Sequence, residues 1–207
     1  MKGKFITFEG CEGVGKSRQI ALLEGYLKGN GVDYVLTREP GGSPVAEKIR
    51  SVILDRKNSE MTDECEALLY AAARAQNLKD TVIPALEQGK LVVCDRYLDS
   101  SYAYQAYARG LGMEYVRSIN GFALSYLPNA TLFLNLSPED AFRRKGGADR
   151  SDRVELAGME FHERVYRGYL AVLEAEPERV VNIDCRGAIE QTHANILAAL
   201  REKEILL

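Results

Sequence analysis

A glycine-rich segment near the start of the chain has the residue types and spacing that hold a phosphate. Residues 10–17 read Gly-Cys-Glu-Gly-Val-Gly-Lys-Ser and match the pattern G-x-x-x-x-G-K-[ST]. Glycines let main-chain N–H groups surround a phosphate without clashes from Cβ atoms. The Lys16 side chain can reach the β- and γ-phosphates, and Ser17 can ligate Mg²⁺. This pattern favours a nucleoside triphosphate site over a plain strand–helix turn, and leaves the reaction open. The predicted triphosphate-binding residues are Gly10, Cys11, Glu12, Gly13, Val14, Gly15, Lys16 and Ser17.

An acidic residue, Asp95, follows the apolar run 91–94. Parallel sheets bind ligands at the carboxyl ends of their strands, so Asp95 can orient the water shell of Mg²⁺ there. The alternative is a turn residue at a strand end, and the phosphate-binding segment favours the metal role. Glu9 ends the run Phe5–Glu9 and has two interpretations, support of Mg²⁺ or of the loop geometry. The predicted Mg²⁺ residues are therefore Ser17, Asp95 and Glu9.

Short apolar runs alternate with longer segments of helical spacing, which predicts parallel β-α-β units with helices on both faces of a sheet. No internal repeat or low-complexity linker divides the chain, so we expect one domain over 1–207. The predicted strands are Phe5–Glu9, 33–37, 91–94, Ala130–Asn135 and Val180–Asp184. The predicted helices are 16–29, 44–55, 63–88, 100–108, 113–125, 138–145, 157–175 and 188–203.

The composition is that of an ordinary globular domain. Of 207 residues, 46% are apolar, and 27 basic against 30 acidic side chains give a net charge of −3. These values exclude a disordered tail protein. The mild acidity weighs against a general nucleic-acid binder, which needs a basic surface. The chain has no run of 18 apolar residues, so the sequence predicts no membrane span.

Cysteine usage predicts a reduced, cytoplasmic compartment. Cys11, Cys65, Cys94 and Cys185 lie far apart and form no C-x-x-C pair, so the sequence gives no support for a zinc or redox motif. The first apolar stretch stops at Glu9, too early for a signal peptide.

Several classes of phosphate-loop protein do not fit this chain. GTPases need a guanine-reading N-K-x-D segment after a strand, but the run 130–136 continues into Ser-Pro-Glu-Asp. Helicases and large ATPases need longer chains. A small kinase that phosphorylates a small acceptor fits the length.

Motifs outside the phosphate loop resemble the thymidylate kinase family over essentially the whole chain. They are F-E-G at 8–10, R-E-P-G-G at 38–42, Y-A-A-A-R at 70–74, D-R-Y at 95–97 with S-S and Y-Q downstream, and D-R-V-E at 152–155. The resemblance implies a P-loop NTPase-type parallel sheet of about five strands, in the order 2-3-1-4-5. It also implies Mg²⁺-assisted transfer of the γ-phosphoryl group of ATP to dTMP, which gives dTDP.

Two arginines and a turn are expected to hold the acceptor phosphate. Arg38 follows a predicted strand, and its planar guanidinium suits a monophosphate dianion. The resemblance assigns Arg38 to the dTMP phosphate, where a surface arginine is the alternative. Pro40 belongs to a turn that lets main chain approach a ligand. Arg96, beside Asp95, is interpreted as a phosphate ligand and catalytic residue.

Side chains spaced by four are expected to surround the base. Tyr70 and Arg74 share a helical face, so a stacking ring and a guanidinium donor would approach the same base. The resemblance implies that Tyr70 stacks on thymine and Arg74 reads its O4 atom. Ser101 and Gln105 are also four apart and resemble polar residues at the base edge. Tyr104 is added to this set, although most of the 11 tyrosines in this chain are expected to be packing residues.

Glu12 needs a separate explanation, because a carboxylate in a phosphate loop repels ATP unless it faces elsewhere. The resemblance implies that it faces the acceptor sugar and accepts a hydrogen bond from the 3′-hydroxyl.

The charge of the transferred phosphoryl group has to be cancelled by residues outside the phosphate loop. Some thymidylate kinases carry an arginine within that loop, where this chain has Gly13. A glycine-containing basic segment at about 143–155 is expected to be a mobile lid, and it resembles the bacterial type whose lid supplies the catalytic arginine. A solvated basic loop is the alternative. Arg150 is the first candidate, followed by Arg153 and Arg144, with Arg144 also assigned to ATP. The predicted catalytic residues are Lys16, Arg96, Arg150 and Arg153.

The expected partners are ATP, dTMP and a second copy of the chain, with no nucleic acid and no membrane. The homodimer is implied by the resemblance, and the helix over 63–88 is its expected contributor. Two alternatives remain: another nucleoside or nucleotide kinase, and a non-catalytic nucleotide-binding module. The adenine pocket has no sequence code, and Arg186 is the one residue suggested for it.

Overall fold

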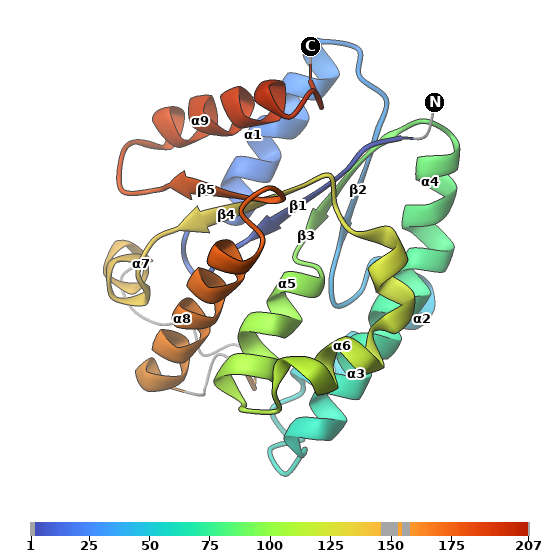
Figure 1. Ribbon diagram of the computed structural model, residues 1–207, viewed down its shortest axis with the longest axis vertical. Coiled ribbons are helices and arrows are strands. Elements are labelled where there is room, and N and C mark those ends of the chain that lie inside the picture. Colours follow the sequence, from blue (N-terminus) through green and yellow to red (C-terminus); the bar gives the residue numbers. More distant parts are fainter. Residues whose placement is uncertain (1–2, 146–152, 155–157, 207) are drawn as a thin grey trace.

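The computed structural model describes residues 3–145, 153–154 and 158–206. Its centre is a parallel five-stranded sheet in the order β2-β3-β1-β4-β5, which is the order that the resemblance implies (Figure 1). The register pairs Ile6 with Val93 on one side of β1 and with Ala130 on the other. The strands are β1 (Phe5–Glu9), β2 (Tyr34–Arg38), β3 (Leu91–Asp95), β4 (Ala130–Asn135) and β5 (Val180–Asp184).

Helices cover both faces of the sheet, as the strand–helix alternation predicts (Figure 1). Helices α1 and α9 pack together on one face, and α4, α5 and α8 lie on the other. The α-helices are α1 (Lys16–Gly29), α2 (Pro44–Leu54), α3 (Asp63–Asn77), α4 (Ile83–Glu87), α5 (Leu98–Ser101), α6 (Met113–Ile119), α7 (Pro138–Lys145), α8 (Met159–Ala175) and α9 (Ile189–Glu202). In the described part of the chain, no helix is long and apolar enough to cross a membrane.

Two predicted helices contain wider π-helical turns. The predicted helix 63–88 is α3, a π-helical segment η1 (Leu78–Val82) and then α4. Pro84 lies in the first turn of α4; proline lacks an N–H, and its ring clashes with the carbonyl four residues earlier in a regular helix. A wider turn before it relieves that clash. A second π-helical segment, η2 (Tyr102–Ala108), continues α5 and forms one wall of the site described below.

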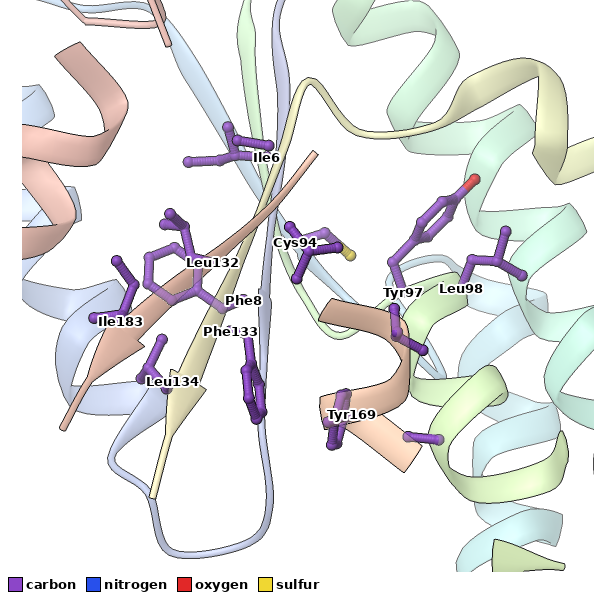
Figure 2. Close-up of a cluster of buried hydrophobic side chains, with 14 of the residues drawn as sticks. Ile6, Phe8, Cys94, Tyr97, Leu98, Leu132, Phe133, Leu134, Tyr169 and Ile183 are labelled. Atoms are coloured by element: carbon purple, nitrogen blue, oxygen red, sulfur yellow. The ribbon is translucent and has the colours of Figure 1, made fainter. Parts of the chain in front are cut away.

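The core lies on both sides of the central strands. Every residue of β1 is buried, which is what a strand covered on both faces requires. Figure 2 shows the cluster around β1 and β4, where Tyr169 of α8 lies beside Phe133 with ring centroids 5.2 Å apart. Phe5 meets Tyr97 edge-on at 5.0 Å. These contacts tie α8 and the segment after β3 to the sheet, and so fix the side chains that both elements carry towards the site.

Candidate active site

A cavity of about 610 Å³ lies at the carboxyl ends of β1, β2 and β3. Such edges of parallel sheets are where ligands bind. The cavity is lined by most residues of the phosphate loop and most of the predicted acceptor residues. From the predicted set, its lining contains Glu12, Gly13, Gly15, Lys16, Ser17, Arg38, Pro40, Tyr70, Arg74, Asp95, Arg96, Tyr104 and Gln105.

The phosphate loop is shaped by its glycines and anchored from beneath. Gly10 has φ +141°, and a Cβ atom there would lie 2.8 Å from the carbonyl oxygen of Leu134. No other residue fits that position without moving the main chain. Cys11 and Val14 are buried in the core and hold the loop against the sheet. Helix α1 begins at Lys16, so its N-terminus, with unpaired N–H groups, borders the cavity.

Lys16 is held at the base of the loop. Its Nζ atom donates to the carbonyl oxygens of Gly10 and Cys11, each at 3.2 Å. Burial and the neighbouring Arg96 lower the pKa of Lys16 to about 8. At neutral pH the ammonium group is still mostly protonated, and an anionic ligand favours that charged form further.

The oxygen donors at the phosphate loop fit Mg²⁺. The Oδ1 atom of Asp95 is buried and accepts no hydrogen bond from the described residues. Ser17 lines the same cavity at the start of α1. In the described ranges no three His, Cys, Asp or Glu side chains form a metal cluster. This suits Mg²⁺, which is usually held by one or two protein groups together with phosphate oxygens.

Glu9 is occupied by protein contacts. Its side chain is fully buried, and Oε1 accepts from the main-chain N–H groups of Tyr97 at 2.7 Å and Ser100 at 3.3 Å. Oε2 accepts from the hydroxyl groups of Ser100 at 2.6 Å and Tyr169 at 2.8 Å. Burial, and to a lesser degree the nearby Asp99, raises the pKa of Glu9 to about 7. These contacts favour the loop-geometry interpretation of Glu9 over the metal one.

Arg96 is fixed in an unusual conformation beneath the cavity. Its φ of +67° lies in the left-handed region, which costs a non-glycine residue about 1–3 kcal/mol. Nη1 donates to the hydroxyl oxygens of Ser100 at 3.3 Å and Tyr169 at 2.9 Å. The guanidinium lies over the ring of Tyr104, 5.2 Å from its centroid. Because Ser100 and Tyr169 also bind Glu9, one buried network holds both the acid and the guanidinium.

Arg74 uses most of its donors within the protein. Nε donates to Glu39 at 2.7 Å, and Nη1 donates to Asn120 at 2.6 Å. Nη2 donates to the carbonyl oxygen of Tyr97 at 3.1 Å and to Ser101 Oγ at 3.0 Å. A guanidinium has five N–H groups, so the contacts with described residues leave one of them. Arg74 lines the cavity, and that remaining donor suits a single carbonyl oxygen of a ligand.

Arg38 stands at the exposed rim of the cavity. Its Nη2 atom lies 3.2 and 3.0 Å from the two carboxylate oxygens of Glu47, and this carboxylate also accepts from the N–H of Gly42 at 2.8 Å. That N–H bond and Arg38 lower the pKa of Glu47. Arg50 donates to the carbonyl oxygen of Pro40 at 2.8 Å and lines the same rim. The R-E-P-G-G turn is thus held by charged side chains of α2.

Known proteins similar to this chain show which family it belongs to. The family model of thymidylate kinases matches residues 8–196. The chain belongs to the thymidylate kinase family. The thymidylate kinase of Finegoldia magna is 47% identical over 98% of this chain and 100% of its own. That of Acholeplasma laidlawii is 49% identical over 93% of this chain and 96% of its own. The crystal structure of the Ehrlichia chaffeensis thymidylate kinase has a TM-score of 0.79 at 28% identity, covering 97% of this chain and 100% of that one.

Membership of the thymidylate kinase family implies ATP-dependent phosphorylation of dTMP, with ATP as the phosphoryl donor. It also explains why the sheet has the order of P-loop NTPases.

The arginines predicted to act from the lid fall into two groups. Arg150 lies outside the described residues, as does most of the predicted lid at 143–155. Arg144 donates to the carbonyl oxygens of Cys185 and Arg186. Arg153 donates to the carbonyl oxygen of Ile53 at 3.1 Å and to the carboxylate of Glu66. Neither Arg144 nor Arg153 lines the main cavity.

Three buried residues that contact side chains of the candidate site have no role predicted from the sequence. Glu39 pairs with Arg74, and burial raises its pKa in spite of that arginine. Glu66 is the second. Glu66, Tyr70 and Arg74 are spaced by four and so share one helical face, and this spacing is a signal that could have revealed Glu66. Tyr169 is the third. No local sequence pattern reveals it, because its partners Ser100 and Glu9 lie 69 and 160 positions away.

Proposed function

We propose that this chain transfers the γ-phosphoryl group of ATP directly to dTMP, giving dTDP, with Mg²⁺ as an assisting ion. One observation carries the proposal: the phosphate loop and the arginines of the R-E-P-G-G and Y-A-A-A-R motifs line one cavity. A volume of about 610 Å³ lies in the range of nucleotide-sized sites. Two anionic ligands that meet in this cavity bring donor and acceptor phosphates together.

At the donor end, the main-chain N–H groups of the loop and Lys16 bind the triphosphate. Ser17 and Asp95 would hold Mg²⁺, which when bound neutralises charge on phosphate oxygens. Arg96 lines the same cavity and would stabilise charge on the oxygens around the transferred group. The proposed lid arginine is Arg150, which would close over the γ-phosphate and exclude water.

At the acceptor end, Arg38 and Arg96 bind the monophosphate, whose oxygen is already anionic and needs no strong general base. Tyr70 stacks on thymine, and Arg74 donates its remaining N–H to O4. Glu12 accepts a hydrogen bond from the 3′-hydroxyl. Since Glu12 is nearly buried in the wall of the cavity, it can face the acceptor sugar away from the triphosphate.

We also propose a homodimer, in keeping with the resemblance, with α3 as a contributor. Leu68 on α3 is half exposed, which suits a helix that meets a second copy. Light scattering of the purified chain measures its mass, and a mass of one chain over the micromolar range would overturn this proposal.

The reaction is tested by a coupled assay with ATP and a panel of dTMP, dUMP, dCMP, AMP and thymidine. The expected result is fastest turnover of dTMP and slow turnover of dUMP, because one methyl group is worth only ~1–3 kcal/mol in a pocket. Preference for thymidine would indicate a nucleoside kinase. An absence of turnover with every acceptor would indicate a binding module and overturn the proposal.

A further inference from the structure

Glu66 is a buried carboxylate at the junction of three segments. It lies on α3, is fully buried, and its two oxygens accept hydrogen bonds from three side chains. Gln105 Nε2 donates to Oε1 at 2.9 Å. Arg109 donates to Oε1 at 3.3 Å and to Oε2 at 2.9 Å, and Arg153 also donates to Oε2. The α3 helix, the π-helical segment η2 and the end of the lid region therefore meet at one acid.

Glu66 is ionised at neutral pH. Burial acts to raise the pKa of this acid, but Arg109, Gln105 and Arg153 together hold it below its ordinary value. An ionised carboxylate has no hydrogen to donate and only accepts. Its partner in Gln105 must therefore be the amide nitrogen.

This contact fixes the orientation of the Gln105 amide. With Nε2 committed to Glu66, Oε1 is the polar atom that Gln105 can offer to a ligand. Gln105 lines the main cavity, and within the described part of the chain no residue donates a hydrogen bond to Oε1. Gln105 therefore presents an acceptor, with its donor side turned away.

Arg74 lines the same cavity and presents a hydrogen-bond donor to it. Within the described part of the chain, four of the five N–H groups of Arg74 are used by Glu39, Asn120, Tyr97 and Ser101, which leaves one donor. Arg74 and Gln105 both line the cavity, and a donor and an acceptor in one pocket suit a base edge that offers a carbonyl oxygen next to an N–H, as in thymine and uracil. Cytosine offers an amino group next to a bare ring nitrogen, which is the reverse pattern.

We propose that Glu66 is a positioning residue that locks the amide of Gln105 and thereby makes the acceptor pocket select thymine-type over cytosine-type bases. The inference rests on the proposed function, because it takes the cavity to be the dTMP site. Glu66 touches no ligand and acts only through Gln105.

The test is Glu66→Gln. Oε2 of Glu66 accepts from both Arg109 and Arg153, so the carbonyl oxygen of glutamine takes that place and its NH₂ group faces Gln105. Gln105 then has to turn its own carbonyl towards residue 66 and its NH₂ group into the cavity. We expect the dTMP-to-dCMP ratio of kcat/KM to fall at least ~10-fold, mostly through a higher KM for dTMP. Calorimetry of each nucleotide without ATP should show the same change in the binding ratio.

Arg109→Gln is the matched control. It removes an ion pair from the same carboxylate but leaves the contact with Gln105, so Tm should fall while the ratio stays within about twofold. Glu66→Asp is the second variant if Glu66→Gln fails to fold, because it keeps the charge but withdraws the oxygens from Gln105, and the ratio should again fall.

An unchanged ratio in the folded Glu66 variant would overturn the inference, and so would an equal loss in Arg109→Gln. Failure of the wild-type chain to phosphorylate dTMP would instead overturn the proposed function. The calorimetric ratio of the two nucleotides is measured whether or not turnover occurs, so the two failures are distinguishable.

Discussion

The two ends of the cavity are built differently. The proposed donor end is a single stretch of main chain, residues 10–17, between a buried strand and a helix. The proposed acceptor end consists of side chains from β2, α2, α3, η2 and the segment after β3. Main-chain N–H groups need only a correct loop, whereas Arg74 and Gln105 must each be held by partners far away in sequence. Affinity for a phosphate can therefore be encoded by a short stretch of sequence, whereas recognition of a base depends on the whole fold.

The two ends also differ in the charged groups that they bury. The acceptor end buries two charged groupings, Arg74 with Glu39 and Glu66 with Arg109 and Arg153. Removing one partner of such a group leaves a charge without compensation in a low-dielectric interior. The donor end keeps its single cation, Lys16, against carbonyl oxygens until a phosphate arrives. Donor variants should therefore lose rate, and acceptor variants should lose stability as well.

The largest effect is expected from the proposed lid arginine. Arg150→Ala should lower kcat by ~10³, because the charge on the transferred phosphoryl group loses its neutralising partner. The KM for dTMP should change little, since the acceptor end is untouched. Steady-state kinetics with both substrates varied makes the measurement. An unchanged kcat would move the role to Arg144 or Arg153.

The acceptor end should respond to Arg74→Met with a loss of stability. The variant leaves Glu39 buried without its partner, and about 3–5 kcal/mol of the free energy of unfolding should be lost. Urea denaturation measures this loss. Arg38→Met is the matched control, because its pair with Glu47 is exposed and should be worth no more than ~1 kcal/mol. Equal losses of unfolding free energy in the two variants would mean that the buried pair is worth no more than the exposed one.

The donor end should respond to Lys16→Ala with a loss of rate. Without the ammonium group, kcat should fall by at least ~10². Calorimetry without ATP should show that dTMP still binds, because Lys16 belongs to the donor end. Near-normal turnover would contradict the assignment of the phosphate loop.

The two ends also differ in how much of each could be predicted from the sequence. The proposed donor site consists of contiguous residues whose chemistry is local, so the motif alone was enough to predict that residues 10–17 border a binding cavity. Three of the predicted strands have the observed bounds. The strand predicted at 33–37 is shifted by one residue to Tyr34–Arg38, and the one predicted at 91–94 ends one residue later, at Asp95. The strand order came from family resemblance, because periodicity does not say which strands are neighbours.

The acceptor site was predicted only in part, because its partners are distant in sequence. Arg74 was found from the Y-A-A-A-R motif, but its contact with Asn120 joins residues 46 positions apart. Tyr169 is 160 positions from Glu9. The π-helical turn of η1 was also missed, because a periodic pattern of apolar residues does not show the clash of the Pro84 ring with the preceding turn.

Glu9 and Arg96 share two hydroxyl partners, so the titration of Glu9 reports the charge that their network holds. The pKa of Glu9 is about 7 in the folded chain and about 4.5 when unperturbed. Between these values the folded state binds the proton more tightly, so Glu9 stabilises the fold below pH 4.5 and this contribution is lost as pH rises through 7. The protonated acid keeps its contacts, because the hydroxyl groups of Ser100 and Tyr169 at Oε2 can accept as well as donate.

Glu9→Gln isolates this contribution, because glutamine stays neutral and its NH₂ group can donate to the same two hydroxyls. Urea denaturation of both proteins at pH 5, 6, 7 and 8 gives the difference in free energy of unfolding at each pH. We expect wild type to lose about 2 kcal/mol relative to the variant between pH 5 and pH 8. A difference that does not change with pH would mean that Glu9 stays ionised in the fold. Its four hydrogen bonds would then outweigh its burial, and the network that it shares with Arg96 would carry a fixed negative charge.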